Sequence, residues 1–63
     1  MDEIKVFVDG NPVNLPEGAS ARLLLRALRR ADCTVAIRRG ERAWSLKDGD
    51  SLENGQEYTI IDR

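Results

Sequence analysis

The sequence has no histidine and a single cysteine, Cys33, among its 63 residues. Without an imidazole, the chain offers neither a Ser/His or Cys/His nucleophile pair nor an ordinary zinc site. One thiol also excludes an internal disulfide framework, the usual staple of small secreted domains. We therefore expect a protein that works in a reducing, cytoplasmic setting, needs no cofactor or metal and is not an enzyme.

Long apolar runs are also missing, and aromatic residues make up only 5% of the chain. Apolar stretches do not exceed three residues, as at 6–8 and 23–25, whereas roughly 20 are needed to cross a bilayer. The acidic start, Met1-Asp2-Glu3, is not that of a signal peptide. A chain of this size is one domain at most. We therefore predict a single domain over residues 1–63, not membrane-bound, that is a monomer or weak oligomer.

Charge is distributed unevenly along the chain. Residues 1–21 carry one lysine against four acids, giving −3, and residues 43–63 carry two basic residues against five acids, also giving −3. Residues 22–42 carry seven arginines against two acids, giving +5. The middle is therefore basic and both ends are acidic, although the total is only −1.

Apolar side chains at every second position predict a β-hairpin at the start of the chain. The pattern runs through 4–8 and again through 13–15. Between them, Asp-Gly-Asn-Pro at 9–12 is a cluster of turn formers. We predict strands over 3–8 and 12–16, with the turn type left open by the Asn-Pro pair.

One amphipathic helix is predicted after Ser20, whose hydroxyl suits an N-cap. From Ala21 to about Ala31 the chain has strong helix formers and neither glycine nor proline. At 100° per residue the helix has an apolar face and an arginine face. The apolar face carries Ala21, Leu24, Ala27, Leu28 and Ala31, and the opposite face carries Arg22, Arg26, Arg29 and Arg30.

Alternation returns after the helix and predicts two or three more strands. They cover 33–38, a short segment with Trp44 and Leu46, and 57–61. This order predicts an α+β fold, with one helix laid across one face of a mixed sheet. The first and last strands are rich in β-branched residues, so we expect them to pair in parallel at the centre.

The pattern resembles the β-grasp (ubiquitin-like) superfamily. The resemblance rests on Ile4 to Gly10, on the helix after Ser20, and on the segment Leu46-Lys47-Asp48-Gly49-Asp50 ahead of a closing apolar strand. It extends to sulfur carriers of the thiamine and molybdopterin type and to bacterial multi-ubiquitin-like domains. The resemblance implies recognition through the exposed sheet face, which makes Phe7, Trp44 and Leu46 candidates.

The C-terminal sequence departs from this family. Sulfur carriers and modifiers end in a flexible Gly-Gly tail, because only glycine lets the backbone approach an activating enzyme closely. This sequence ends Ile60-Ile61-Asp62-Arg63. We therefore expect neither a carrier nor a modifier, and the alternative is such a protein whose Gly-Gly tail lies beyond Arg63.

The arginines of the middle third are the most conspicuous polar feature, and three interpretations stay open. They form a solvated surface, they bind an acidic protein, or they bind nucleic acid. Nucleic acid is the least favoured partner, because the total charge is acidic and no aromatic residues interleave with the arginines. We expect a non-catalytic interaction module that docks on a larger protein through its sheet face, its arginine-rich helix or both, with an acidic partner as one of the open interpretations; a small nucleic-acid-binding domain is a further alternative. The candidate contacts are Arg22, Arg26, Arg29, Arg38, Arg39 and Trp44.

Three other features have a plainer interpretation. Cys33 continues an apolar alternation, so we expect a core residue rather than a reactive thiol. Trp44 either caps the core beside the helix or serves as a partly exposed anchor. The acidic residues of 48–57 lack the spacing of a calcium loop, so we expect a solvated turn.

Overall fold

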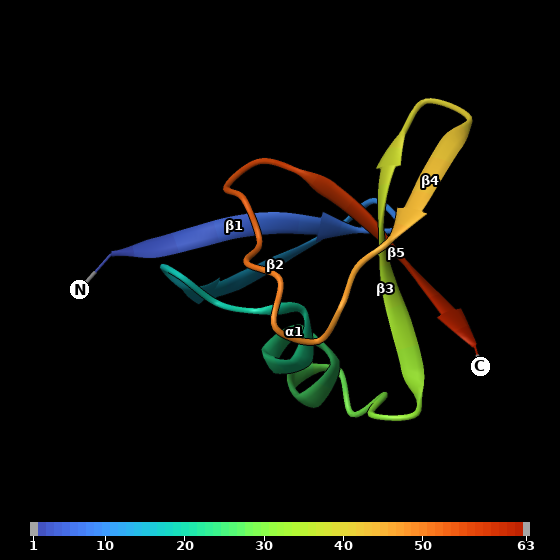
Figure 1. The fold of residues 1–63 in the computed structure, drawn as a ribbon. Helices are drawn as coiled ribbons and strands as arrows, with labels where there is room; N and C mark the ends of the chain where they lie inside the picture. Colours follow the sequence, from blue (N-terminus) through green and yellow to red (C-terminus); the bar gives the residue numbers. More distant parts are fainter. Residues whose placement is uncertain (1, 63) are drawn as a thin grey trace.

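A computed structural model of the protein describes residues 2–62; Met1 and Arg63, the last residue of the predicted C-terminal tail, lie outside the described residues. The described residues form five strands and one helix, and Figure 1 shows the helix on one side of the sheet. The elements are β1 (Glu3–Val8), β2 (Asn11–Pro16), α1 (Ala21–Ala27), β3 (Cys33–Arg39), β4 (Arg42–Ser45) and β5 (Glu57–Asp62). The predicted α+β class and mixed sheet are confirmed, in the strand order β2-β1-β5-β3-β4.

The first hairpin has a two-residue turn at Asp9 and Gly10. Both residues have positive φ, 49° and 87°, which is the pattern of a type I′ turn and matches the twist of the flanking strands. Asn11 already pairs with Val8, so β2 begins one residue before the predicted start. The hydroxyl of Thr59 donates to the Asp9 carboxylate at 2.7 Å, which ties this turn to β5.

The last strand lies in the middle of the sheet. β5 runs parallel to β1, with Val8 paired to Tyr58, and antiparallel to β3. The predicted parallel pairing of first and last strands is therefore confirmed. Tyr58 is fully buried, and its hydroxyl accepts a hydrogen bond from the Glu53 N–H at 2.8 Å.

The helix is shorter than predicted, because it ends at Ala27 and not near Ala31. The N–H groups of Arg29 and Arg30 donate back to carbonyls of the last turn, at 3.1 and 2.8 Å. These two bonds form a Schellman motif, which needs a left-handed residue just after the helix. Arg29 takes that position with a φ of 57°.

The buried face of α1 also differs from the predicted one. Ala21 and Leu24 are buried as expected, but Leu25 is buried as well, while Ala27 and Ala31 are exposed. A leucine removes more apolar surface from water than an alanine does. The helix is therefore turned so that Leu24 and Leu25, rather than Ala27, face the sheet.

The core lies between α1 and one face of the sheet. Cys33 belongs to it with 2% of its surface exposed, as predicted, and among the described residues no polar or charged side chain is buried. The buried members are Ile4, Val6, Val8, Leu15, Ala19, Ala21, Leu24, Leu25, Cys33, Val35, Leu52 and Tyr58. Within residues 2–62, no helix is long and apolar enough to span a membrane.

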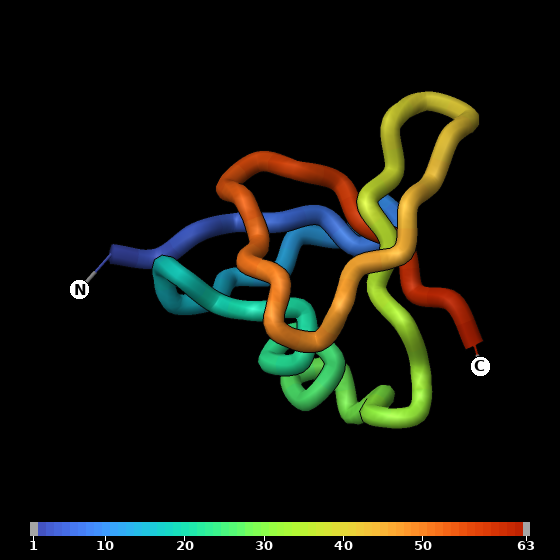
Figure 2. The backbone as a smooth tube through the Cα atoms, viewed as in Figure 1, coloured from blue at the N-terminus to red at the C-terminus, as the bar shows by residue number. Residues whose placement is uncertain are grey.

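The loop between β4 and β5 crosses the start of α1, as Figure 2 shows. The Asp50 carbonyl accepts from the Ala21 N–H at 2.9 Å, and the Asp48 carbonyl accepts from Arg22 at 3.0 Å. The next amide donates to the hydroxyl of Ser20, which confirms the predicted N-cap. The first amides of the helix therefore find their partners inside the chain.

Candidate functional site

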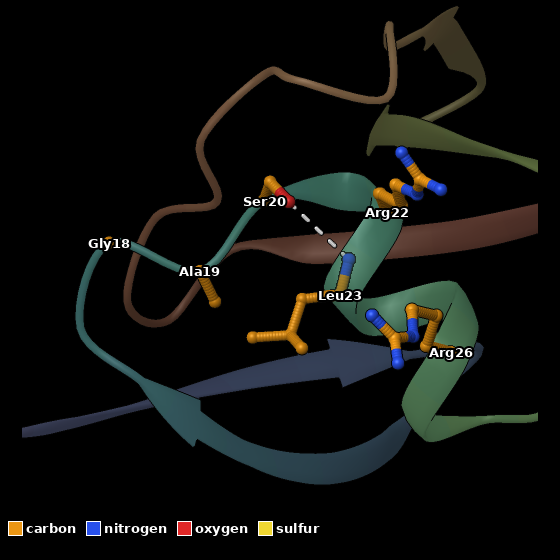
Figure 3. Close-up of a pocket in the computed structure, with 6 residues that line it drawn as sticks. All are labelled: Gly18, Ala19, Ser20, Arg22, Leu23 and Arg26. Atoms are coloured by element: carbon orange, nitrogen blue, oxygen red, sulfur yellow. Dashed lines mark hydrogen bonds between the residues drawn. The ribbon is translucent and has the colours of Figure 1, made fainter.

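The structure divides the predicted arginine surface into separate places. Arg22 and Arg26 lie on α1, where Figure 3 shows them beside the exposed Leu23. Arg38 and Arg39 lie at the end of β3, in a hairpin that extends away from α1 in Figure 1. Two positions therefore remain of the predicted helical arginine face, because the helix ends before Arg29 and Arg30.

The arginines of α1 border a shallow hollow at the start of the helix. Its lining is Gly18, Ala19, Ser20, Arg22, Leu23 and Arg26. The hydroxyl of Ser20 already accepts from the Leu23 N–H at 3.4 Å. The hollow therefore offers two exposed guanidinium groups over a small apolar floor, with no buried polar group among the described residues to fix a ligand.

Arg30 is turned toward the end of β5. Its guanidinium donates to the Asp62 carboxylate at 3.0 Å, and the Cys33 thiol donates to the same oxygen at 3.2 Å. The Cys33 hydrogen bond, followed by Arg30, lowers the pKa of Asp62. Arg30 lowers the pKa of the Cys33 thiol, but the hydrogen bond to Asp62 and burial raise it by more, so the pKa of Cys33 lies above its ordinary value. The thiol is therefore a weak nucleophile, since the thiolate is the reactive form.

Hydrogen bonds between side chains and backbone N–H groups hold the loop that carries the acidic residues of 48–57. The Asp50 carboxylate accepts from the Lys47 N–H at 2.8 Å, and the Lys5 N–H donates to the Asn54 side chain at 2.8 Å. No group of three metal-ligating side chains occurs among residues 2–62. The loop closes a turn and holds β1.

The β3–β4 hairpin brings together the remaining candidates. Its turn consists of Gly40 and Glu41, and Gly40 has a φ of 61°, the pattern of a type II′ turn with glycine first. Arg39 pairs with Arg42 across the strands, followed by Ile37 with Trp44. Cross-strand partners share a face of the sheet, so Arg39, Arg42 and Trp44 lie together.

Trp44 lies on the helix side of the sheet but beyond the reach of the helix. It pairs with Ile37, which pairs with the buried Tyr58, so its ring continues the core face. The Trp44 side chain is nevertheless 48% exposed. Trp44 therefore does not cap the core beside the helix, and its role as a partly exposed anchor stays a prediction. Phe7 alternates with the core residues of β1 and lies on the opposite face, so Phe7 does not share a surface with Trp44.

We define the hairpin patch as Arg39, Arg42 and Trp44, which share one face of the hairpin; Arg38 pairs with Ala43 and lies on the other face. None of the three arginines of the hairpin forms an ion pair with a described acidic residue; the Nε of Arg38 donates only weakly, to the Gly40 carbonyl at 3.5 Å. With Glu41 as its one acid, the hairpin over 37–45 has a net charge of +2. Arg42 was outside the predicted contact set, although its place in the same basic segment is visible in the sequence.

This patch combines unpaired guanidinium groups, an exposed indole and the outermost strand of the sheet. Guanidinium groups bind carboxylates in a bidentate way, and an indole supplies apolar contact area. The arrangement is suited to binding an acidic surface rather than to chemistry. Comparisons with protein-family models, with curated proteins and with solved structures gave no match for this chain.

Proposed function

We propose that the chain is a β-grasp, ubiquitin-like domain that acts as a non-catalytic protein-interaction module. The strand order β2-β1-β5-β3-β4, the parallel pairing of β1 with β5 and a single helix on one face support this fold. The parallel pairing and the single helix on one face are also what the sequence pattern predicts. The buried Cys33 thiol with its raised pKa supports a non-catalytic role.

The hairpin patch carries the proposal for the docking surface. Trp44 is half exposed and lies beside Arg39 and Arg42, which lack acidic partners among the described residues. Tryptophan and arginine are the residue types most enriched among binding hot spots. A local charge of +2 in a chain of net charge −1 favours a partner with an acidic surface.

Charge reversal on the hairpin tests this proposal. The immobilised chain is used to capture proteins from cells, and the captured proteins are compared with those held by the double variant Arg39→Glu and Arg42→Glu. The matched control reverses the same number of charges on α1, with Arg22→Glu and Arg26→Glu. All four side chains are exposed, so circular dichroism should show an unchanged fold in both variants.

We expect the hairpin variant to lose acidic partners that the helix variant retains. Equal capture by the wild type and the hairpin variant would contradict the hairpin patch as the docking surface. Loss of captured proteins in the helix variant alone would assign the docking surface to α1. Capture that disappears when nucleic acid is digested would point to the nucleic-acid alternative.

A further inference from the structure

The two edges of the sheet differ in their ability to accept another strand. β2, at one edge, contains Pro12 and Pro16, and proline lacks the N–H that strand pairing needs. β4, at the other edge, contains no proline, and all four of its residues are exposed. β4 is therefore the open edge of the described sheet.

The backbone pattern of β4 shows which of its groups face outward. The Leu46 N–H donates to a β3 carbonyl at 2.8 Å, and antiparallel ladder bonds fall on every second residue. Trp44 and Arg42 therefore direct their backbone groups toward β3. Ala43 and Ser45 direct theirs away from the sheet, and neither forms another backbone hydrogen bond with the described residues.

Side chains around this edge select the strand that fits it. On one face, an added strand would meet Trp44 and, two residues away, Arg42, with Arg39 behind it. This calls for an apolar residue and an acidic residue two positions apart, because side chains two apart share a face. A second copy of β4 is disfavoured, because it would bring together two hairpins that each have a net charge of +2.

We propose that β4 accepts an extended acidic segment of a partner protein as a sixth strand, held by the outward backbone groups of Ala43 and Ser45. This inference rests on the proposed function and names how the partner binds. Backbone pairing supplies affinity in such complexes, and the alternate side chains supply specificity. Here Trp44 receives the apolar side chain, and Arg39 and Arg42 receive the carboxylate.

The probe is a short synthetic peptide whose one face alternates valine and glutamate, with threonine at the positions between. Trp44 is the only tryptophan of the chain, so its fluorescence reports on β4 directly. We expect the peptide to change the Trp44 emission at low salt and to shift the NMR signals of the Ala43 and Ser45 amides. A version that is N-methylated on its pairing edge keeps every charge and should bind at least about tenfold more weakly, which corresponds to 1.4 kcal/mol.

A matched pair of protein variants tests the same edge from the other side. Ala43→Pro removes an outward N–H and spares the bonds to β3, whereas Ala43→Val keeps the N–H. We expect Ala43→Pro to weaken peptide binding by about tenfold, the loss of roughly one hydrogen bond, and Ala43→Val to bind like the wild type. Because the methylated peptide needs no protein variant, the result does not depend on how well Ala43→Pro folds.

Several outcomes would overturn the inference. One such outcome is that the methylated peptide binds as well as the parent peptide, while the double variant Arg39→Glu and Arg42→Glu no longer binds. That result would support docking at the hairpin patch and contradict strand addition at β4. If neither peptide binds at low salt, strand addition at β4 fails. Tighter binding of a single-stranded oligonucleotide than of the parent peptide would contradict both proposals. A dimer that Ala43→Pro dissociates would assign the edge to a second copy.

Discussion

At the scale of single residues, Arg29 carries backbone strain that glycine would avoid. Its φ of 57° lies in the left-handed region, which costs an L-residue roughly 1–2 kcal/mol. We expect Arg29→Gly to raise the free energy of unfolding by about 0.5–1 kcal/mol, since glycine also loses more chain entropy on folding. Urea unfolding, followed by Trp44 fluorescence, measures this change in the free energy of unfolding. The control Arg26→Gly, inside α1, should lower stability by about 1 kcal/mol; a loss in both variants would contradict the role of Arg29.

Asp62 gives the stability a pH dependence of known sign. The hydrogen bond from Cys33 and the Arg30 ion pair lower the pKa of Asp62 in the folded state. The stabilisation is therefore present at neutral pH and is lost as the pH falls below the ordinary aspartate range, roughly pH 4. At pH 7 the urea concentration at the unfolding midpoint should be higher for the wild type than for Asp62→Asn. This difference should become smaller as the pH is lowered toward 3. Because Arg30 and Asp62 are exposed, salt should also reduce the difference; a difference unchanged by pH would contradict this account.

At the scale of elements, most strand bounds could be predicted to within one residue, whereas β4 ends at Ser45, before the predicted Leu46, and the helix end could not be predicted. The period-two pattern placed β1 at its observed bounds, and β3 extends one residue beyond its predicted end. Helix ends are usually marked by glycine or proline, and α1 has neither at its end. Arg29 adopts the glycine conformation instead, so the prediction continued to Ala31 and placed too many arginines on one face.

The hairpin patch was only partly accessible to prediction, because it depends on pairing between distant segments. Its arginines and Trp44 are evident in the sequence. Which face Trp44 occupies follows from the β3–β4 register, and its exposure follows from the short reach of α1. That β4 is an edge strand follows from the place of β5 between β1 and β3, and the central place of the last strand could be predicted from its β-branched residues.

At the scale of the whole molecule, stability rests on a small core. Folded proteins are stable by roughly 0.05–0.15 kcal/mol per residue, so the loss of one central leucine is a large fraction of the total here. Leu24 is fully buried, whereas the adjacent Leu23 is 36% exposed. We expect Leu24→Ala to cost about 2–5 kcal/mol and Leu23→Ala less than about 1 kcal/mol. Urea unfolding compares them, and similar losses would contradict the observed orientation of α1.

The central place of β5 also decides when the protein can fold during its own synthesis. A ribosome delivers β1, β2, α1, β3 and β4 before β5, yet β5 is the strand that joins the β1–β2 hairpin to the β3–β4 hairpin. Isolated hairpins are marginally stable in water. The nascent chain should therefore stay unfolded, with its core residues exposed to water, until β5 has left the ribosomal exit tunnel. It should then fold in a single step.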